Sequence, residues 1–261
     1  MTPVIANLSD QVWNVLIKPI EKRFFTMKKI VVIGGGTMGL DIAQVFARNG
    51  YDVVVRDIKD EIIQASEARL NKGLDKLVSK GKLDEAKKAE ILSHMSFTTE
   101  LAAAADADLV VEAAIENLDI KKSIFAELDS LCKPETILAS NTSSISITAI
   151  AAATKRADKF IGMHFFNPVP AMKLVEVIAG GNTPAELVDY IKNLSTEIGK
   201  TPVVVNEAPG FVVNKLLIPM INDAIGLVES GTASVEDIDK SMRLGANHPM
   251  GPLALGDFIG L

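Results

Sequence analysis

Two residues in the middle of the sequence have the types and the spacing of an acid–base pair. His164 lies in one apolar stretch, and Glu176 follows 12 residues later in another, Lys173–Ile178. A lone carboxylate in an apolar strand is costly, so Glu176 needs a partner, and His164 is the candidate. An imidazole bonded to a carboxylate is fixed in one tautomer and made more basic, as abstraction of an alcohol proton during hydride transfer requires. The alternative is a core histidine beside a strand-edge glutamate.

Polar residues elsewhere in the chain extend this candidate site. Ser140–Ser144 directly follows an expected strand, and His164 begins the segment His164–Pro168. In α/β proteins, sites are formed by loops at the carboxyl ends of the strands. Asn214 interrupts a helix that is otherwise apolar nearly all round, so it must find hydrogen-bond partners, either structural ones or a substrate oxygen.

A glycine-rich loop near residue 34 has the pattern of a dinucleotide-binding turn. The apolar run Ile30–Ile33 precedes Gly34–Gly39, and a helical stretch follows. Gly34 would allow a tight turn, Gly36 a close approach to a pyrophosphate, and Gly39 close packing of helix on strand. The helix N-terminus would add amides and a positive dipole. We assign cofactor binding to the loop residues Gly34, Gly36, Thr37, Met38 and Gly39.

An acidic residue follows at the distance where this motif places its ribose ligand. Asp57 ends the apolar run Val53–Val55 and lies 18 residues after Gly39. Its carboxylate would accept hydrogen bonds from ribose hydroxyls and repel a 2′-phosphate, so the sequence favours NAD. Arg56 and Lys59 flank Asp57, and NADP is therefore not excluded.

Strand and helix patterns alternate along the chain that must position these residues. Expected helices cover 60–80, 84–95 and 120–131, and expected strands cover 109–111, 136–139, 160–163 and 202–205. This alternation predicts a Rossmann-type, doubly wound α/β sheet. After Asn206 only helical patterns follow, and Ser234 is expected to cap one of them. We therefore expect a dinucleotide-binding domain over 27–206 and a smaller all-helical domain over 207–261.

The composition of the 261-residue chain is that of an ordinary globular protein, with 48% hydrophobic and 23% charged residues. The net charge of −6 opposes attraction to phosphate backbones, so we expect no nucleic-acid partner. Cys132 is the single cysteine, and the three histidines form no cluster that resembles a metal site. We therefore expect no metal, no disulfide and a reducing compartment such as the cytoplasm.

The first 26 residues carry no sustained apolar run, so they match neither a secretory signal nor a membrane span. We expect no membrane partner. The sequence from Met27 onward is typical of the start of a domain. We therefore interpret residues 1–26 as an upstream extension that is not part of the fold.

A basic face runs along the expected helix over 60–80. Lys72, Lys76 and Lys80 recur every four residues, opposite a stripe that includes Leu70 and Leu74. Such a face is usually only solvated. The functional alternative is a binding surface for a phosphorylated substrate.

Several longer motifs make residues 28–261 resemble one enzyme family. The stretches Ser140–Ser144, His164–Pro168, Met172–Glu176 and Ala208–Asn214 closely resemble those of the short-chain L-3-hydroxyacyl-CoA dehydrogenase family. The resemblance implies an oxidoreductase of fatty acid and butanoate metabolism that interconverts acetoacetyl-CoA and (S)-3-hydroxybutyryl-CoA with NAD(H). The implied partners are an acyl-CoA substrate and, where the C-terminal domain is complete, a second copy of the chain in a homodimer.

The resemblance also implies roles for individual residues. His164 matches the catalytic base of the family, and Glu176 matches the carboxylate that orients it. Ser143 and Asn214 match the polar groups around the reacting oxygens of the substrate. The positions that match the cofactor cleft of the family are Glu116, Lys121 and Asn141.

Two features depart from the family pattern. Asp41, expected in the first turn of the glycine-loop helix, stands where the family more often has a small residue, and its carboxylate should weaken pyrophosphate binding modestly. Family members continue past Leu261 with further helices, so we expect the helical domain to be incomplete. The alternatives to an active dehydrogenase are a non-catalytic NAD-binding fragment and another β-hydroxyacid dehydrogenase of the same two-domain plan.

Overall fold

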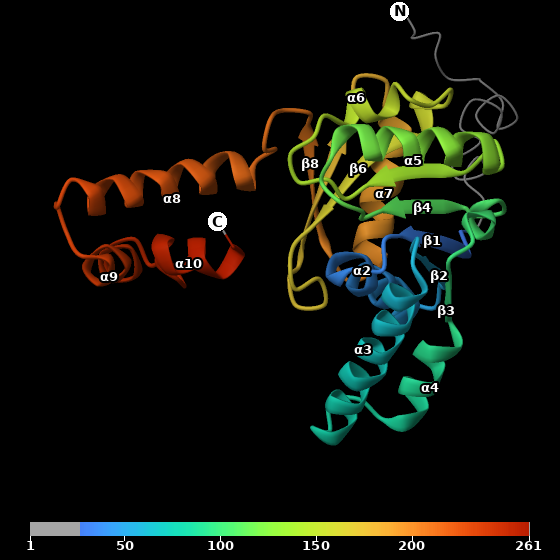
Figure 1. Cartoon of the computed structure of the whole chain (residues 1–261), viewed down its shortest axis with the longest axis horizontal. Helices are drawn as coiled ribbons and strands as arrows, with labels where there is room; N and C mark the ends of the chain where they lie inside the picture. Colours follow the sequence, from blue (N-terminus) through green and yellow to red (C-terminus); the bar gives the residue numbers. More distant parts are fainter. Residues whose placement is uncertain (1–26, 261) are drawn as a thin grey trace, which may run out of the picture. The chain divides into compact units, whose positions relative to one another are not determined.

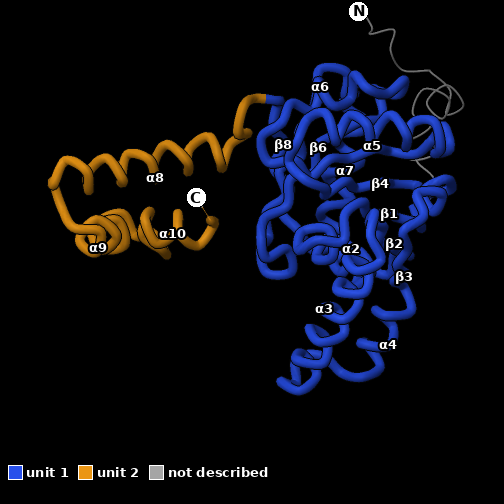
Figure 2. The backbone as a smooth tube through the Cα atoms, viewed as in Figure 1, with its two compact units in different colours: residues 1–207 blue, residues 208–261 orange. Residues whose placement is uncertain are grey.

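The structure of the chain is a computed structural model that describes residues 27–260 (Figure 1). It has two compact units, of which the first ends at Glu207 and the second begins at Ala208 (Figure 2). The expected extension over residues 1–26 lies outside the described residues. The unit boundary differs by one residue from the expected end of the dinucleotide-binding domain at Asn206.

The first unit is built around one sheet of eight strands in the described part of the chain, in the order β3-β2-β1-β4-β5-β6-β7-β8. The strands are β1 (Lys29–Ile33), β2 (Asp52–Arg56), β3 (Met95–Thr98), β4 (Leu109–Glu112), β5 (Ile137–Ser140), β6 (Phe160–Phe165), β7 (Leu174–Ala179) and β8 (Thr201–Asn206). Neighbouring strands are parallel, except that β6 and β7 are antiparallel. This strand order confirms the predicted Rossmann-type, doubly wound fold.

Helices connect the strands and cover the sheet. They are α2 (Thr37–Arg48), α3 (Asp60–Ser79), α4 (Glu85–Ser93), α5 (Leu118–Leu131), α6 (Ile147–Ala151) and α7 (Ala185–Glu197). Short 3₁₀ helices span Leu101–Ala104 and Ala157–Lys159. In Figure 1, α5 and α6 lie on one side of the sheet, and α2 and α7 lie on the other.

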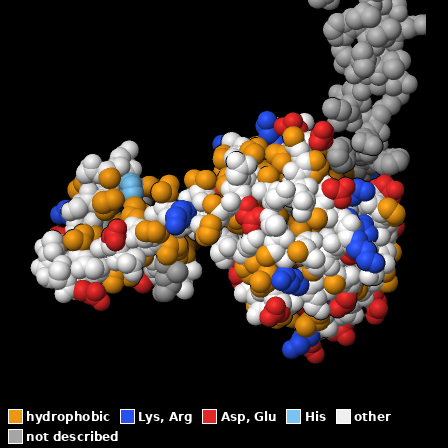
Figure 3. All heavy atoms as spheres, turned by 90° about the horizontal axis from the view of Figure 1, so that it is seen from above, with side chains coloured by type: hydrophobic (Ala, Val, Ile, Leu, Met, Phe, Trp, Pro, Cys, Tyr) orange, Lys and Arg blue, Asp and Glu red, His pale blue; other side chains and the backbone are white. Residues whose placement is uncertain are grey.

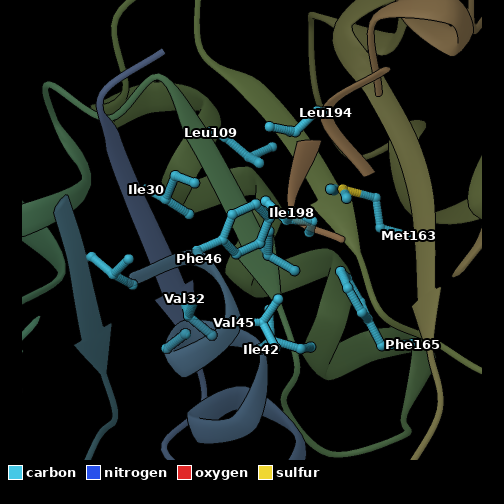
Figure 4. Packing of buried hydrophobic residues seen from close by; sticks show 14 of the residues in the cluster. Ile30, Val32, Ile42, Val45, Phe46, Leu109, Met163, Phe165, Leu194 and Ile198 are labelled. Carbon is cyan, nitrogen blue, oxygen red and sulfur yellow. The ribbon is translucent and has the colours of Figure 1, made fainter. Parts of the chain in front are cut away.

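Burial on both faces of the sheet explains the continuous apolar runs of the sequence. Ile30–Val32 of β1 is fully buried, so β1 cannot show the alternating pattern of a strand with one wet face. One large cluster joins Leu109 of β4 to Phe46 of α2 and Leu194 of α7 (Figure 4). Cys132 is also buried, and burial raises the pKa of its thiol to about 11.

Some elements differ from the sequence-based expectations. The helix expected over 84–95 ends at Ser93, and Met95–Thr98 instead forms the edge strand β3. This strand was missed because it has only four residues and none of them is fully buried, so it leaves no continuous apolar run. The helices α6 and α7 were also not predicted.

The second unit contains three helices within residues 208–260, α8 (Val213–Glu229), α9 (Val235–Gly245) and α10 (Pro252–Ile259). The predicted cap at Ser234 is confirmed, because its hydroxyl accepts a hydrogen bond of 3.1 Å from the backbone N–H of Asp237. The N-cap of α10 is Gly251, and the Asp239 carboxylate of α9 accepts hydrogen bonds from the backbone N–H groups of Leu253 and Ala254 in the first turn of α10, both at 2.9 Å.

The apolar helix α8 was expected to be buried or at an interface. In this helix Ile221 and Ala224 are buried, whereas Leu216 is 70% exposed. Among the described residues, the structure has no helix with the length and apolar composition needed to cross a membrane.

Candidate active site

The proposed acid–base pair is assembled by the antiparallel pairing of β6 and β7. In this ladder His164 and Glu176 are direct partners, so their side chains leave the sheet on the same face. Nδ1 of His164 lies 2.8 Å from Oε2 of Glu176, and both side chains are buried. The ring of Phe166 lies against the imidazole, with 4.4 Å between the two centroids. The interpretation that Glu176 has His164 as its partner therefore agrees with the geometry.

The glycine loop after β1 has the backbone that each glycine position requires. Gly34 has a φ of +108°, a conformation that side chains disfavour. A Cβ at Gly39 would lie 1.9 Å from the carbonyl oxygen of Gly34, so only glycine lets α2 pack this closely on the loop. A Cβ at Gly36 would meet nothing within 4 Å, which leaves open space beside the backbone for a bound group.

This open space lies at the N-terminus of α2, where helix amides attract anions. Gly36 and Thr37 are exposed and Met38 is half-buried, and within residues 27–260 no side chain caps this end of the helix. The missing cap leaves backbone N–H groups for a diphosphate. The residues of this loop therefore fit a dinucleotide.

Asp57 at the end of β2 is joined directly to the glycine loop. Its Oδ2 accepts a hydrogen bond of 2.6 Å from the backbone N–H of Gly35, and its Oδ1 accepts one of 2.7 Å from Ile58. The carboxylate thus fixes the loop, and its remaining lone pairs suit ribose hydroxyls.

Glu116 joins two loops that follow β4 and β5. Its Oε1 accepts hydrogen bonds from the hydroxyl of Thr142 at 2.5 Å and from the backbone N–H and hydroxyl of Ser143 at 2.9 and 3.3 Å. Burial opposes its ionisation, but the bonds from Thr142 and Ser143 and the nearby charge of Lys121 hold the pKa of Glu116 below its ordinary value. The residues Glu116, Lys121 and Ser143, far apart in sequence, are thus brought together.

Lys121 is held by a carboxylate that the sequence-based reasoning missed. Its Nζ lies 2.7 Å from Oε1 of Glu112 and 3.3 Å from Oε2 of Glu116. Glu112 is fully buried at the end of β4, where it also accepts from the hydroxyl of Ser140 at 2.6 Å. The clue was present, because Glu112 ends an apolar run just as Glu176 interrupts one.

Asn141 connects the loop after β5 to the strand of the histidine. Its Oδ1 accepts a hydrogen bond of 2.9 Å from the backbone N–H of Phe165, the residue after His164. Asn141 therefore helps to fix the backbone around the candidate base.

The remaining predicted site residues belong to other elements. Asn214 belongs to α8 in the second unit, and its predicted role stays a prediction. Lys72, Lys76 and Lys80 are exposed along the last turns of α3 and at its C-terminal cap. No group of three or more His, Cys, Asp or Glu residues in the described part of the chain could hold a metal ion.

The glycine loop, Glu116, Asn141 and His164 all lie at the carboxyl edge of the parallel strands, the edge at which such folds bind their ligands. A dinucleotide loop and a buried histidine–carboxylate pair at one edge are the arrangement of a nicotinamide-dependent dehydrogenase. Comparison with known proteins identifies the family within this class.

The family model for the NAD-binding domain of 3-hydroxyacyl-CoA dehydrogenase matches residues 29–208, and that for the C-terminal domain matches residues 210–261. The chain belongs to the 3-hydroxyacyl-CoA dehydrogenase family and is an NAD-dependent enzyme. The resemblance inferred from the sequence motifs is thereby confirmed.

Individual relatives are similar over most of the chain. A 3-hydroxybutyryl-CoA dehydrogenase of Clostridioides difficile is 58% identical over 233 residues, which cover 89% of this chain and 83% of the relative. A probable 3-hydroxybutyryl-CoA dehydrogenase of Deinococcus radiodurans is 53% identical over 233 residues, which cover 89% of this chain and 84% of that relative. The crystal structure of the (S)-3-hydroxybutyryl-CoA dehydrogenase of Ralstonia eutropha matches with a TM-score of 0.87 at 48% identity. The match covers 90% of this chain and 83% of that structure's chain.

Proposed function

We propose that the enzyme interconverts acetoacetyl-CoA and (S)-3-hydroxybutyryl-CoA with NAD(H). The observation that carries this proposal is the buried bond between His164 and Glu176, which prepares a base at the same sheet edge as the cofactor loop. The substrate is supported by the names of relatives that are 58% and 53% identical. We also propose a role in fatty acid and butanoate metabolism, which the resemblance to the family implies.

In the oxidative direction, His164 takes the proton of the C3 hydroxyl through Nε2. Glu176 accepts from Nδ1–H, which leaves Nε2 as the basic nitrogen and stabilises the imidazolium that forms. NAD supplies the acceptor for the hydride that leaves C3. In the reductive direction, the protonated His164 donates to the carbonyl oxygen at C3.

We assign the remaining site residues by their chemistry and by their place in the family pattern. Ser143 and Asn214 would donate to the reacting oxygens of the substrate. The proposed cofactor-binding residues are Gly34, Gly36, Thr37, Met38, Gly39, Asp57, Glu116, Lys121 and Asn141. Lys121 acts here through Glu116, because its own side chain is only 1% exposed.

The basic face of Lys72, Lys76 and Lys80 is proposed to bind phosphate groups of coenzyme A. Three exposed cations on one helix face offer the charge that such an anion needs. Replacing all three by Ala should raise the KM for acetoacetyl-CoA with little change in NADH affinity. Loss of NADH affinity instead would assign this face to the cofactor.

The cellular setting and the assembly are part of the same proposal. A cytoplasmic location agrees with the bacterial relatives and with the buried, unpaired Cys132. A homodimer agrees with the apolar side chains on the surface of the second unit (Figure 3), among which Leu216, Leu244 and Phe258 are exposed by 70%, 75% and 65%. Sedimentation of the purified chain measures the oligomeric state.

The experiment that tests the function follows NADH absorbance with acetoacetyl-CoA as substrate. Depletion of NADH is expected, and His164→Ala should abolish it while NADH binding remains close to that of the wild type. Folded protein that binds NADH without turnover would instead identify a non-catalytic NAD-binding fragment. Faster turnover of free hydroxy acids than of 3-hydroxybutyryl-CoA would identify a different β-hydroxyacid dehydrogenase.

A further inference from the structure

The glycine loop is contacted by a cation that lies on another helix. Arg69 on α3 donates from one terminal nitrogen to the carbonyl oxygen of Gly36 at 2.8 Å and from the other to the hydroxyl of Thr37 at 3.1 Å. Gly36 and Thr37 are the two exposed residues of the loop, at the uncapped N-terminus of α2. Arg69 therefore adds a positive charge at the place where the helix already attracts an anion.

The position of Arg69 is fixed by a buried contact one turn earlier on the same helix. The hydroxyl of Ser66 donates to the carbonyl oxygen of Gly35, and Ser66 is only 2% exposed. This bond anchors α3 against the loop, so the guanidinium three residues later is presented to the exposed side of the loop.

A second charged side chain, Asp41, lies near Arg69. Asp41 begins the second turn of α2, not the first turn as expected from the sequence. Burial raises the pKa of Asp41, whereas the nearby charges of Arg69 and Arg48 act to lower it. The expected repulsion of a diphosphate by Asp41 is therefore opposed by Arg69.

We propose that Arg69 is a further cofactor-binding residue, whose guanidinium pairs with the diphosphate of the dinucleotide at the N-terminus of α2. A guanidinium carries five N–H donors in a fixed fork, so it can hold the loop through two of them and donate others to phosphate oxygens. Lysine would keep the charge but lacks the planar fork that matches several acceptors at once. The inference rests on the proposed function only through its cofactor, and it deepens that function by adding a residue to the site.

The test measures NADH affinity directly, by titrating NADH fluorescence at low salt. Arg69→Ala should raise the Kd for NADH about tenfold, the range of a charge-assisted hydrogen bond. The Kd of Arg69→Lys for NADH should lie between those of the wild type and Arg69→Ala, because lysine keeps the charge but lacks the planar fork. The difference from the wild type should shrink as salt is added, because exposed charges are screened.

A matched control and a second ligand make the result specific. Lys192→Ala removes one charge from α7, where the side chain is 50% exposed, and it should bind NADH like the wild type. Binding of acetoacetyl-CoA, measured by calorimetry, should be unchanged in Arg69→Ala. Wild-type NADH affinity in Arg69→Ala, or a loss confined to acetoacetyl-CoA, would overturn the proposal. A wild type that binds NADH without turnover contradicts the proposed function and leaves this test intact.

Discussion

Nζ of Lys121 lies 2.7 Å from Oε1 of Glu112, and neither side chain is more than 1% exposed. The carboxylate comes from the end of β4 and the amine from the first turns of α5. Because Glu112 also bonds Ser140 and Lys121 also reaches Glu116, this ion pair connects the ends of two strands to the Ser143 loop.

Breaking this pair from one side should destabilise the fold strongly. Lys121→Met leaves the Glu112 carboxylate buried without its cation, which typically costs about 3–5 kcal/mol. Denaturant unfolding measures the loss. Lys192→Met, at an exposed site on α7, should change stability by less than about 0.5 kcal/mol. Adding Glu112→Gln to Lys121→Met should recover part of the loss, and equal stability of all these variants would contradict the assignment.

Replacing the carboxylate that orients the base should slow the chemical step. Glu176→Gln keeps the shape of the side chain, but it can no longer stabilise the imidazolium of His164. We expect kcat to fall on the order of 100-fold or more. The control is Glu186→Gln, an exposed residue of α7, which should keep wild-type kcat. A fall in NADH affinity as large as the fall in kcat would show that Glu176 acts on the fold.

Two glycines of the loop should respond differently to the same added methyl group. At Gly39 the methyl group would overlap the Gly34 carbonyl, so Gly39→Ala should lower stability by about 1–3 kcal/mol and weaken NADH binding. At Gly36 the methyl group meets no protein atom, so Gly36→Ala should fold normally and still weaken NADH binding. Thermal unfolding and NADH titration separate the two. Unchanged NADH affinity in Gly36→Ala would contradict the proposal that the diphosphate binds next to this residue.

The lowered pKa of Glu116 predicts how one part of the stability depends on pH. A carboxylate with a lowered pKa stabilises the folded state at pH values above its ordinary pKa of 4.5. This contribution is lost as the pH falls through the lowered pKa of the folded state. Glu116→Gln should therefore be less stable than the wild type at pH 7, by at most about 1 kcal/mol because solvent screens a side chain that is 38% exposed. The difference should vanish in acid. A constant difference from pH 7 to pH 3 would exclude an electrostatic origin.

Most of the fold could be predicted from the sequence because buried parallel strands and the glycine loop leave local patterns. The pairing of His164 with Glu176 could also be inferred, since a carboxylate in an apolar strand demands a partner. The partner of Lys121 could not be found in this way. In its own helix Lys121 resembles any solvated lysine, and only the folded position of α5 at the end of β4 places Glu112 beside it.

The strand order also has a consequence for how the chain folds as it is synthesised. From β4 onward, each strand pairs with the next one in the chain, whereas β1 pairs with β2 and then with the much later β4. One edge of the apolar strand β1 therefore has no sheet partner while α3, α4 and β3 are being translated. Unpaired apolar edges promote aggregation. The nascent chain should therefore be most prone to aggregation, and depend most on chaperones, in the interval before β4 pairs with β1.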